Sequence, residues 1–291
     1  MRCVLVPKYI QIDVLLVMFL VTGLVTGLPS KRAVSLAHRV CLPGPDINQQ
    51  KESTKNHSKC LILGDSISIG YTSYAKKALA KKCTVHHAPW DIGDGGALDT
   101  KHGLHCLQLL TSSSTLHPVT YDAVVLNFGL HDINCDQVQD EFTSLENYTN
   151  NLRFLKTFFL STGAKLAYAL TTPILDDCDA NHLVIEYNQA AYKVMRNKPQ
   201  VEVINLYDVI FKKCGGPPNK IKAPGCPVTN KTLIPHYTSY GYKLLADPVT
   251  KTFNKLLKSN LATKKKKLKD WFIDLVRTSS DVSNRKESSE S

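Results

Sequence analysis

The 291-residue sequence lacks several patterns, and each absence narrows what the chain can be. No two cysteines stand in CxxC spacing, which argues against a structural zinc site. No basic stretch is interleaved with aromatic residues, so a nucleic-acid-binding face is not expected despite a formal net charge of +11. No internal repeat is present, so a repeat architecture is not expected either.

The apolar run near the N-terminus is too short for an ordinary membrane span. It extends from Val14 to Leu28, about 15 residues, whereas a transmembrane helix needs roughly 20. Arg2 and Lys8 precede the run, and small residues at cleavage spacing follow its core. The sequence therefore predicts a signal peptide over residues 1–27 and a secreted chain. The alternative is a type II signal anchor that holds the chain in the secretory pathway.

Cysteines and glycosylation motifs favour the same compartment. Of the nine cysteines, Cys3 would leave with the signal peptide, and the remaining even number is typical of disulfide bonding in an exported chain. Three Asn-x-Ser/Thr motifs predict N-glycosylation at Asn56, Asn147 and Asn230.

Short apolar segments alternate with helix-length segments through the middle of the chain. The strand-like segments are residues 59–64, 83–88, 121–129, 164–170 and 201–206. This alternation predicts an α/β fold, a three-layer α/β/α sandwich with a five-stranded parallel sheet of the flavodoxin-like kind. The folded domain is expected over residues 58–259, after an N-terminal extension over residues 28–57.

Residues 260–291 form a basic amphipathic segment followed by a Ser-rich tail. Five lysines lie between Lys264 and Lys269, just before an apolar stretch. We favour a solvated helical extension that runs into a disordered tail, because charge runs are usually solvated. The alternative is a weak contact with an anionic surface through Lys264–Lys269.

Two disulfide pairs are expected from the order of these segments. Cys135 and Cys178 come just after the third and fourth strands, on loops that would be neighbours in the sheet. Cys214 and Cys226 bracket a short Gly/Pro-rich loop, which closes at modest entropic cost. The sequence therefore predicts Cys135–Cys178 and Cys214–Cys226 bridges.

A serine follows the first predicted strand at the edge where α/β proteins place functional residues, beyond the C-terminal ends of parallel strands. Ser66, in Gly64-Asp65-Ser66, comes where a helix begins. Its N–H would be an unpaired donor at the positive end of the helix dipole, which stabilises the negative charge that develops in acyl transfer. Capping of the helix is the common alternative use of such a serine.

Three other loops would bring possible partners to the same edge. Gly93 could present a backbone N–H to an oxyanion, a role that Gly95 or Gly96 could take instead. His131 follows the third strand and offers a side-chain donor. His236 precedes a helix near the C-terminus and could reach the serine as a base.

Four ordered blocks resemble those of SGNH/GDSL-type hydrolases: GDS at 64–66, the glycine loop at 93–96, GLHD at 129–132 and HYTSYGYKLLAD at 236–247. The resemblance is to a subgroup whose third block reads GLHD, and it covers residues 59 to about 257. It implies an SGNH fold and hydrolysis of a carboxylic ester, such as an O-acyl group on a glycan, with no metal or organic cofactor. By the same resemblance Ser66 is the nucleophile, His236 is the general base, and Ser66 N–H, Gly93 N–H and the His131 side chain form the oxyanion hole.

Two positions depart from the family pattern. Position 131 is usually Asn, and His131 keeps a hydrogen-bond donor there. The family normally has Asp three residues before the catalytic histidine, where this chain has Leu233, a side chain that cannot orient an imidazole. Two functions therefore stay open. One is a serine esterase working through a Ser66–His236 dyad, which a backbone carbonyl could support, and the other is an inactive SGNH-fold secreted protein that binds glycan or protein.

Overall fold

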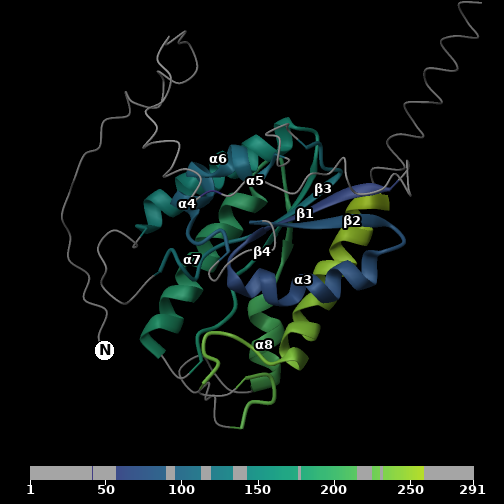
Figure 1. Ribbon diagram of the computed structural model, residues 1–291. Helices are drawn as coiled ribbons and strands as arrows, with labels where there is room; N and C mark the ends of the chain where they lie inside the picture. Colours follow the sequence, from purple (N-terminus) through teal and green to yellow (C-terminus); the bar gives the residue numbers. More distant parts are fainter. Residues whose placement is uncertain are drawn as a thin grey trace, which may run out of the picture.

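A five-stranded sheet forms the centre of the computed structural model, which describes residues 41, 57–89, 96–112, 119–133, 143–175, 178–214, 225–229 and 232–258. The strands are β1 (Ser58–Gly64), β2 (Cys83–Ala88), β3 (Ala123–Asn127), β4 (Lys165–Ala169) and β5 (Glu202–Ile204). Every neighbouring pair is parallel, in the order β2-β1-β3-β4-β5 (Figure 1). The predicted α/β fold with a five-stranded parallel sheet is confirmed.

Helices cover both faces of this sheet (Figure 1). One face carries α4 (Thr100–His105), α5 (Leu107–Leu110), α6 (Leu145–Ser161) and α7 (Cys178–Arg196). The other carries α3 (Ser66–Leu79), α8 (Leu206–Cys214) and a helix over residues 239–258. The three layers therefore follow the chain order that the alternating segments predicted.

The central strands are apolar throughout because both of their sides face helices. In β1, Cys60 and Ile62 belong to the core under α3, and Leu61 and Leu63 belong to the core under α6 and α7. All four side chains are fully buried. Full burial of one Leu or Ile stabilises the fold by roughly 1.5–3 kcal/mol. The central strands therefore form a stable base for the loops at the carboxyl edge of the sheet.

Helices α4 and α5 are both short, and they meet at Cys106. Cys106 is disulfide-bonded to Cys41, a buried residue that the sequence analysis assigns to the predicted N-terminal extension. Cys41 is thus covalently tied to the junction of α4 and α5.

Two further disulfides join Cys60 to Cys83, across β1 and β2, and Cys214 to Cys226. The second of these is the bridge that the spacing predicts. Cys135 lies outside the described residues, so the Cys135–Cys178 bridge stays a prediction. Of the glycosylation motifs, Asn147 is exposed in the first turn of α6, and Asn56 and Asn230 lie outside the described residues.

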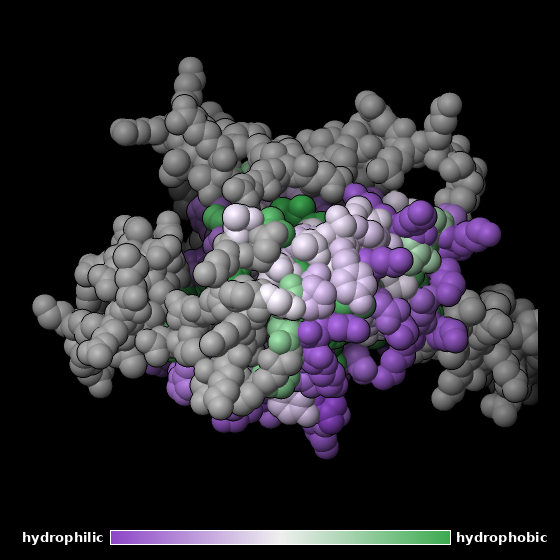
Figure 2. Space-filling view, turned by 90° about the horizontal axis from the view of Figure 1, so that it is seen from below, coloured by the Kyte–Doolittle hydropathy of each residue, from purple (hydrophilic) through white to green (hydrophobic). Residues whose placement is uncertain are grey.

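The described surface is mixed in character. Seen from below, hydrophilic side chains crowd one side of it, and a paler, partly hydrophobic region lies beside them (Figure 2). The exposed large hydrophobic residues of the described part are Phe154, Tyr192 and Tyr240. Within that part, no helix combines the length and apolarity that crossing a bilayer requires. The predicted signal peptide (1–27) and tail (260–291) lie outside the described residues.

Candidate active site

The turn from β1 into α3 holds Ser66 at the carboxyl edge of the sheet. The Asp65 carboxylate accepts a hydrogen bond from Ile67 N at 3.0 Å and so caps α3. Gly64 has no room for a side chain, because a Cβ there would collide with the carbonyl oxygen of Asn127. The Ser66 side chain is half-buried in the first turn of α3, where backbone N–H groups lack helical partners.

The structure brings His236 to this serine from 170 residues further along the chain, with His236 Nε2 at 2.8 Å from Ser66 Oγ. Hydrogen bonds from Thr229, Tyr237 and Thr238 hold the histidine's loop. Thr229 Oγ1 donates to the His236 carbonyl at 2.7 Å, and Thr238 N donates to Val228 O at 2.8 Å. The Tyr237 hydroxyl donates to Pro173 O, beyond β4, at 3.1 Å. The contact between the serine and the histidine therefore rests on an anchored loop.

The other ring nitrogen of His236 lacks this support. Among the described residues, His236 Nδ1 makes no hydrogen bond, neither to a carboxylate nor to a backbone carbonyl. Leu233 lies half-buried one turn before it, and its carbonyl accepts a hydrogen bond from His236 N. The backbone thus places side chain 233 in the turn that ends at His236, but leucine offers the ring no acceptor.

The glycine loop is described only at its end. Gly93 and Gly95 lie outside the described residues, so the assignment of an oxyanion donor to Gly93 stays a prediction. Gly96 pairs with Asp65 in an isolated antiparallel bridge, and Ala97 N donates to Gly64 O at 2.8 Å. A Cβ at Gly96 would lie 2.6 Å from Gly64 O, and its φ is +64°, so only glycine fits there. The loop therefore returns directly against the serine's turn.

His131 lies half-buried in the turn after β3, beside the α4 histidines. Burial lowers the pKa of His102; the Asp99 carboxylate opposes this, and His105 and His131 add to the lowering. The next residue, Asp132, is buried and accepts from Thr100 N at 3.0 Å and Thr100 Oγ1 at 2.6 Å. Burial raises the pKa of Asp132 to about 7, although the bonds from Thr100 oppose that shift. This bonding fixes the His131 turn to the start of α4.

Several buried polar residues of the site were missed in the sequence analysis. Asn127, at the end of β3, donates to Ala169 O at 3.1 Å and accepts from the Tyr71 hydroxyl at 3.2 Å. A single amide ending an apolar strand was the available signal for it. Asp65 is fully buried, burial raises its pKa to about 7, and its Oδ2 has no hydrogen-bond partner among the described residues.

A second serine–histidine pair was also missed. Ser68 Oγ lies 2.6 Å from His87 Nε2, and both side chains are buried. His87 Nδ1 lies 3.0 Å from Pro89 O, and Ser68 Oγ lies 2.7 Å from Asp65 O. No local motif in the sequence marks this contact. The described residues contain no group of three or more His, Cys, Asp or Glu arranged to hold a metal ion.

No protein-family model matches the sequence, and no curated protein matches it. Solved structures share its fold. An acetyl xylan esterase, AlAXEase, superposes with a TM-score of 0.53 over 67% of this chain and 98% of that one, at 15% identity. A catalytic mutant of Axe2, an acetylxylan esterase from Geobacillus stearothermophilus, superposes with a TM-score of 0.52 over 70% of this chain and 96% of that one, at 12% identity. The fold of this chain therefore matches that of these two acetylxylan esterase structures.

Proposed function

We propose that this chain is a secreted serine esterase that hydrolyses carboxylic esters, with O-acyl groups on glycans as its substrate class. The observation that carries the proposal is the 2.8 Å contact between Ser66 Oγ and His236 Nε2, at the carboxyl edge of a parallel sheet and the N-terminus of α3. The similar structures are acetylxylan esterases, and the catalytic mutants of the Geobacillus enzyme replace a serine or an aspartate. Position 66 supplies the serine in this chain, and Leu233 stands where the SGNH pattern has the aspartate.

The proposed reaction passes through an acyl-enzyme. Ser66 Oγ attacks the ester carbonyl carbon and gives its proton to His236 Nε2. The oxyanion accepts hydrogen bonds from Ser66 N–H, Gly93 N–H and His131. The tetrahedral intermediate then expels the alcohol, which takes the proton from His236. Water, deprotonated by His236, hydrolyses the Ser66 ester and releases the carboxylic acid and free serine.

Secretion is part of the proposal and rests on the N-terminal sequence and the cysteines. Three disulfides join described residues, and such bonds persist in oxidising compartments. The exposed side chain of Asn147 is accessible to the glycosylation that its motif predicts. Cleavage of the signal peptide after residue 27 belongs to this proposal as well. So does a solvated basic segment at Lys264–Lys269, with contact to an anionic surface as its alternative.

One observation favours a second function, a secreted SGNH-fold protein that binds glycan or protein without turnover. His236 Nδ1 has no acceptor within the described residues, and position 233 is leucine. In a serine hydrolase the acid holds the imidazole in the correct tautomer, and neutralising it lowers kcat by about 10⁴-fold. The two functions share their fold and differ in turnover alone.

The deciding experiment is active-site labelling of the secreted full chain. A fluorophosphonate probe is expected to label the wild type at Ser66, as located by peptide mapping, and to leave Ser66→Ala unlabelled. Hydrolysis of acetylated xylooligosaccharides and p-nitrophenyl acetate is expected to disappear with the labelling. A wild type that neither reacts with the probe nor exceeds Ser66→Ala on these esters would establish the binding function instead.

A further inference from the structure

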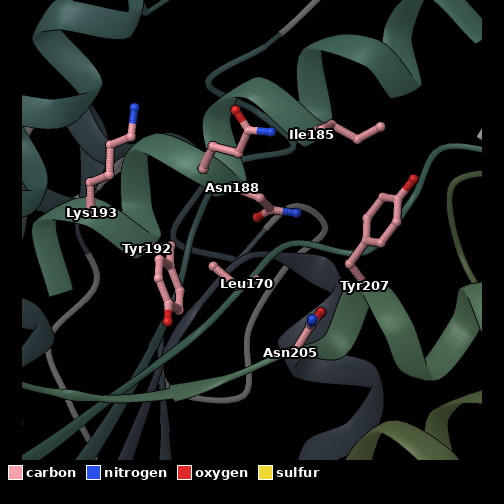
Figure 3. Close-up of a pocket in the computed structure, with 8 residues that line it drawn as sticks. Leu170, Ile185, Asn188, Tyr192, Lys193, Asn205 and Tyr207 are labelled. Atoms are coloured by element: carbon pink, nitrogen blue, oxygen red, sulfur yellow. The ribbon is translucent and has the colours of Figure 1, made fainter. Parts of the chain in front are cut away.

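A cavity of about 360 Å³ opens beside the sheet edge, between α7 and the start of α8. Its size lies in the range of small-molecule sites, roughly 300–1,000 Å³. Leu170, Tyr192 and Tyr207 contribute apolar walls, and the polar lining includes Asn188, Gln189 and Asn205. In Figure 3 the two tyrosines stand at opposite ends of the cavity, with Leu170, Asn188 and Asn205 between them.

Two of the polar groups are fixed in position by the fold. The Asn188 amide is buried, and it accepts from Thr171 N at 2.8 Å and donates to Thr171 O at 2.9 Å. An amide carries two donors and two acceptor lone pairs, so Asn188 keeps one of each for a ligand. Asn205 Oδ1 accepts from Asp208 N at 3.0 Å, which leaves its NH₂ group. These amides are therefore set before a ligand arrives.

The two aromatic walls differ in their contacts and in their exposure. The Tyr207 hydroxyl accepts from Asn181 Nδ2 at 2.9 Å, and its ring stacks on Phe211 with centroids 6.0 Å apart. Tyr192 is 48% exposed and forms the outer wall. The cavity thus combines flat apolar faces with hydrogen-bonding groups. A sugar ring matches this combination, because its C–H faces are apolar and its hydroxyl edge both donates and accepts.

The cavity lies at the carboxyl edge that also carries Ser66. Leu170 directly follows β4 and Asn205 directly follows β5. The order β1-β3-β4-β5 puts three strand spacings between Ser66 and Asn205, about 14 Å. An acyl group bonded to Ser66 does not span that distance, whereas an oligosaccharide does. The amide groups of Asn188 and Asn205 in the cavity also disfavour a purely aliphatic ligand, which would leave these groups unpaired.

We propose that this cavity is a carbohydrate subsite that holds a sugar ring of an oligosaccharide chain, apart from the ring that carries the ester. The inference rests on the proposed function for the link to catalysis, but binding at the cavity is independent of turnover. Tyr192 packs on a face of the sugar, while the amides of Asn188 and Asn205 bond to its hydroxyls.

Binding is measured on the full-length Ser66→Ala chain by calorimetric titration with hexasaccharides of β-1,4-linked xylose, glucose and N-acetylglucosamine. At least one is expected to bind saturably, and Tyr192→Ala is expected to weaken its binding at least ~10-fold. Tyr192 is exposed, so folding should survive the change. Phe154→Ala on α6, another exposed aromatic, is the control and should leave binding unchanged. Gln189→Ala is expected to weaken binding by a smaller factor.

Kinetics separate the subsite from the esterase. With Ser66 intact, Tyr192→Ala should leave p-nitrophenyl acetate hydrolysis unchanged and raise KM for an acetylated hexasaccharide. Absence of saturable binding by all three sugars, or binding that ignores Tyr192→Ala, overturns the subsite. Binding that depends on Tyr192 in a chain that hydrolyses no ester upholds the subsite and overturns the esterase.

Discussion

Two serine–histidine pairs start from the first turn of α3, and the residues around them differ. Ser66 and His236 are half-buried and lie 2.8 Å apart. Ser68 and His87 are buried and lie 2.6 Å apart. Hydrogen-bond distance therefore does not distinguish them. Access does, because only the first pair can meet an ester without prior unfolding of the turn.

A hydrogen-bond acceptor for the second ring nitrogen of the histidine, Nδ1, is present in the buried pair and absent, among the described residues, from the accessible pair. Pro89 O can only accept, so its hydrogen bond with His87 Nδ1 requires a proton on that nitrogen. This is the carbonyl support that a catalytic dyad without an acid requires, and it occurs in the buried pair. His236 Nδ1 has no acceptor in the described part of the chain. The buried pair thus serves packing, and the accessible pair has the position for chemistry without the usual orienting group.

Matched serine substitutions test this division most strongly. Ser66→Ala is expected to lower kcat on p-nitrophenyl acetate at least ~10³-fold, because it removes the attacking oxygen. Its free energy of unfolding should stay near that of the wild type. Ser68→Ala is expected to keep most of the activity and to lower the free energy of unfolding by about 1–3 kcal/mol, because it strands the buried His87 nitrogen. Stopped assays and urea titration measure the two effects. The reverse pattern would assign the chemistry to the buried pair.

The carboxyl group of Asp65, the residue just before Ser66, has a pH-dependent effect on stability. Burial raises the pKa of Asp65 from 3.8 to about 7, so the folded state binds this proton more tightly than the unfolded state. Its stabilising contribution is therefore complete below about pH 4 and is lost as the pH rises through about 7, a change on the order of 2–4 kcal/mol. The coupled hydroxyl of Tyr71 stays neutral in this range because burial raises its pKa.

Asp65→Asn isolates that contribution, because asparagine still caps a helix but does not ionise here. The difference in unfolding free energy between wild type and Asp65→Asn should change across pH 4–8, as urea titrations at several pH values measure. Asp132→Asn is the companion variant, since burial also raises the pKa of Asp132 to about 7. A wild-type minus Asp65→Asn difference that is constant over this range would mean that Asp65 ionises as an exposed carboxyl group does.

The features that followed from the sequence are those encoded locally. The strands could be predicted because parallel strands buried on both faces are continuous apolar runs. Ser66 and His236 could be predicted because each stands in an ordered block, Ser66 after a predicted strand and His236 before a predicted helix. Four features could not be predicted from the sequence: the Ser68–His87 pair, the Cys41–Cys106 and Cys60–Cys83 disulfides, and the hydrogen bonds between Asn188 and Thr171. Each joins segments that look ordinary alone, and only the packed sheet brings them together.

Leu233 offers the sharpest test of the missing support. The backbone already forms the turn, since His236 N donates to Leu233 O. Leu233→Asp should place a carboxylate near Nδ1, fix the tautomer that leaves Nε2 free to accept, and stabilise the imidazolium. We expect kcat on p-nitrophenyl acetate to rise at least ~10-fold, about 1.4 kcal/mol of transition-state stabilisation.

Two controls make that result interpretable. The side chain introduced by Leu233→Asn has nearly the shape of aspartate without its charge, so this variant should give a smaller increase in kcat. Adding Ser66→Ala to the Leu233→Asp variant should abolish the rate. A kcat that stays level or falls would show that the ring is already oriented, for instance by a carbonyl beyond the described residues, with the new carboxylate adding only a desolvation cost. A rise that survives Ser66→Ala would place the reaction outside the Ser66–His236 pair. A tenfold rise that requires both Ser66 and the negative charge introduced by Leu233→Asp would show that orientation of His236 limits the rate.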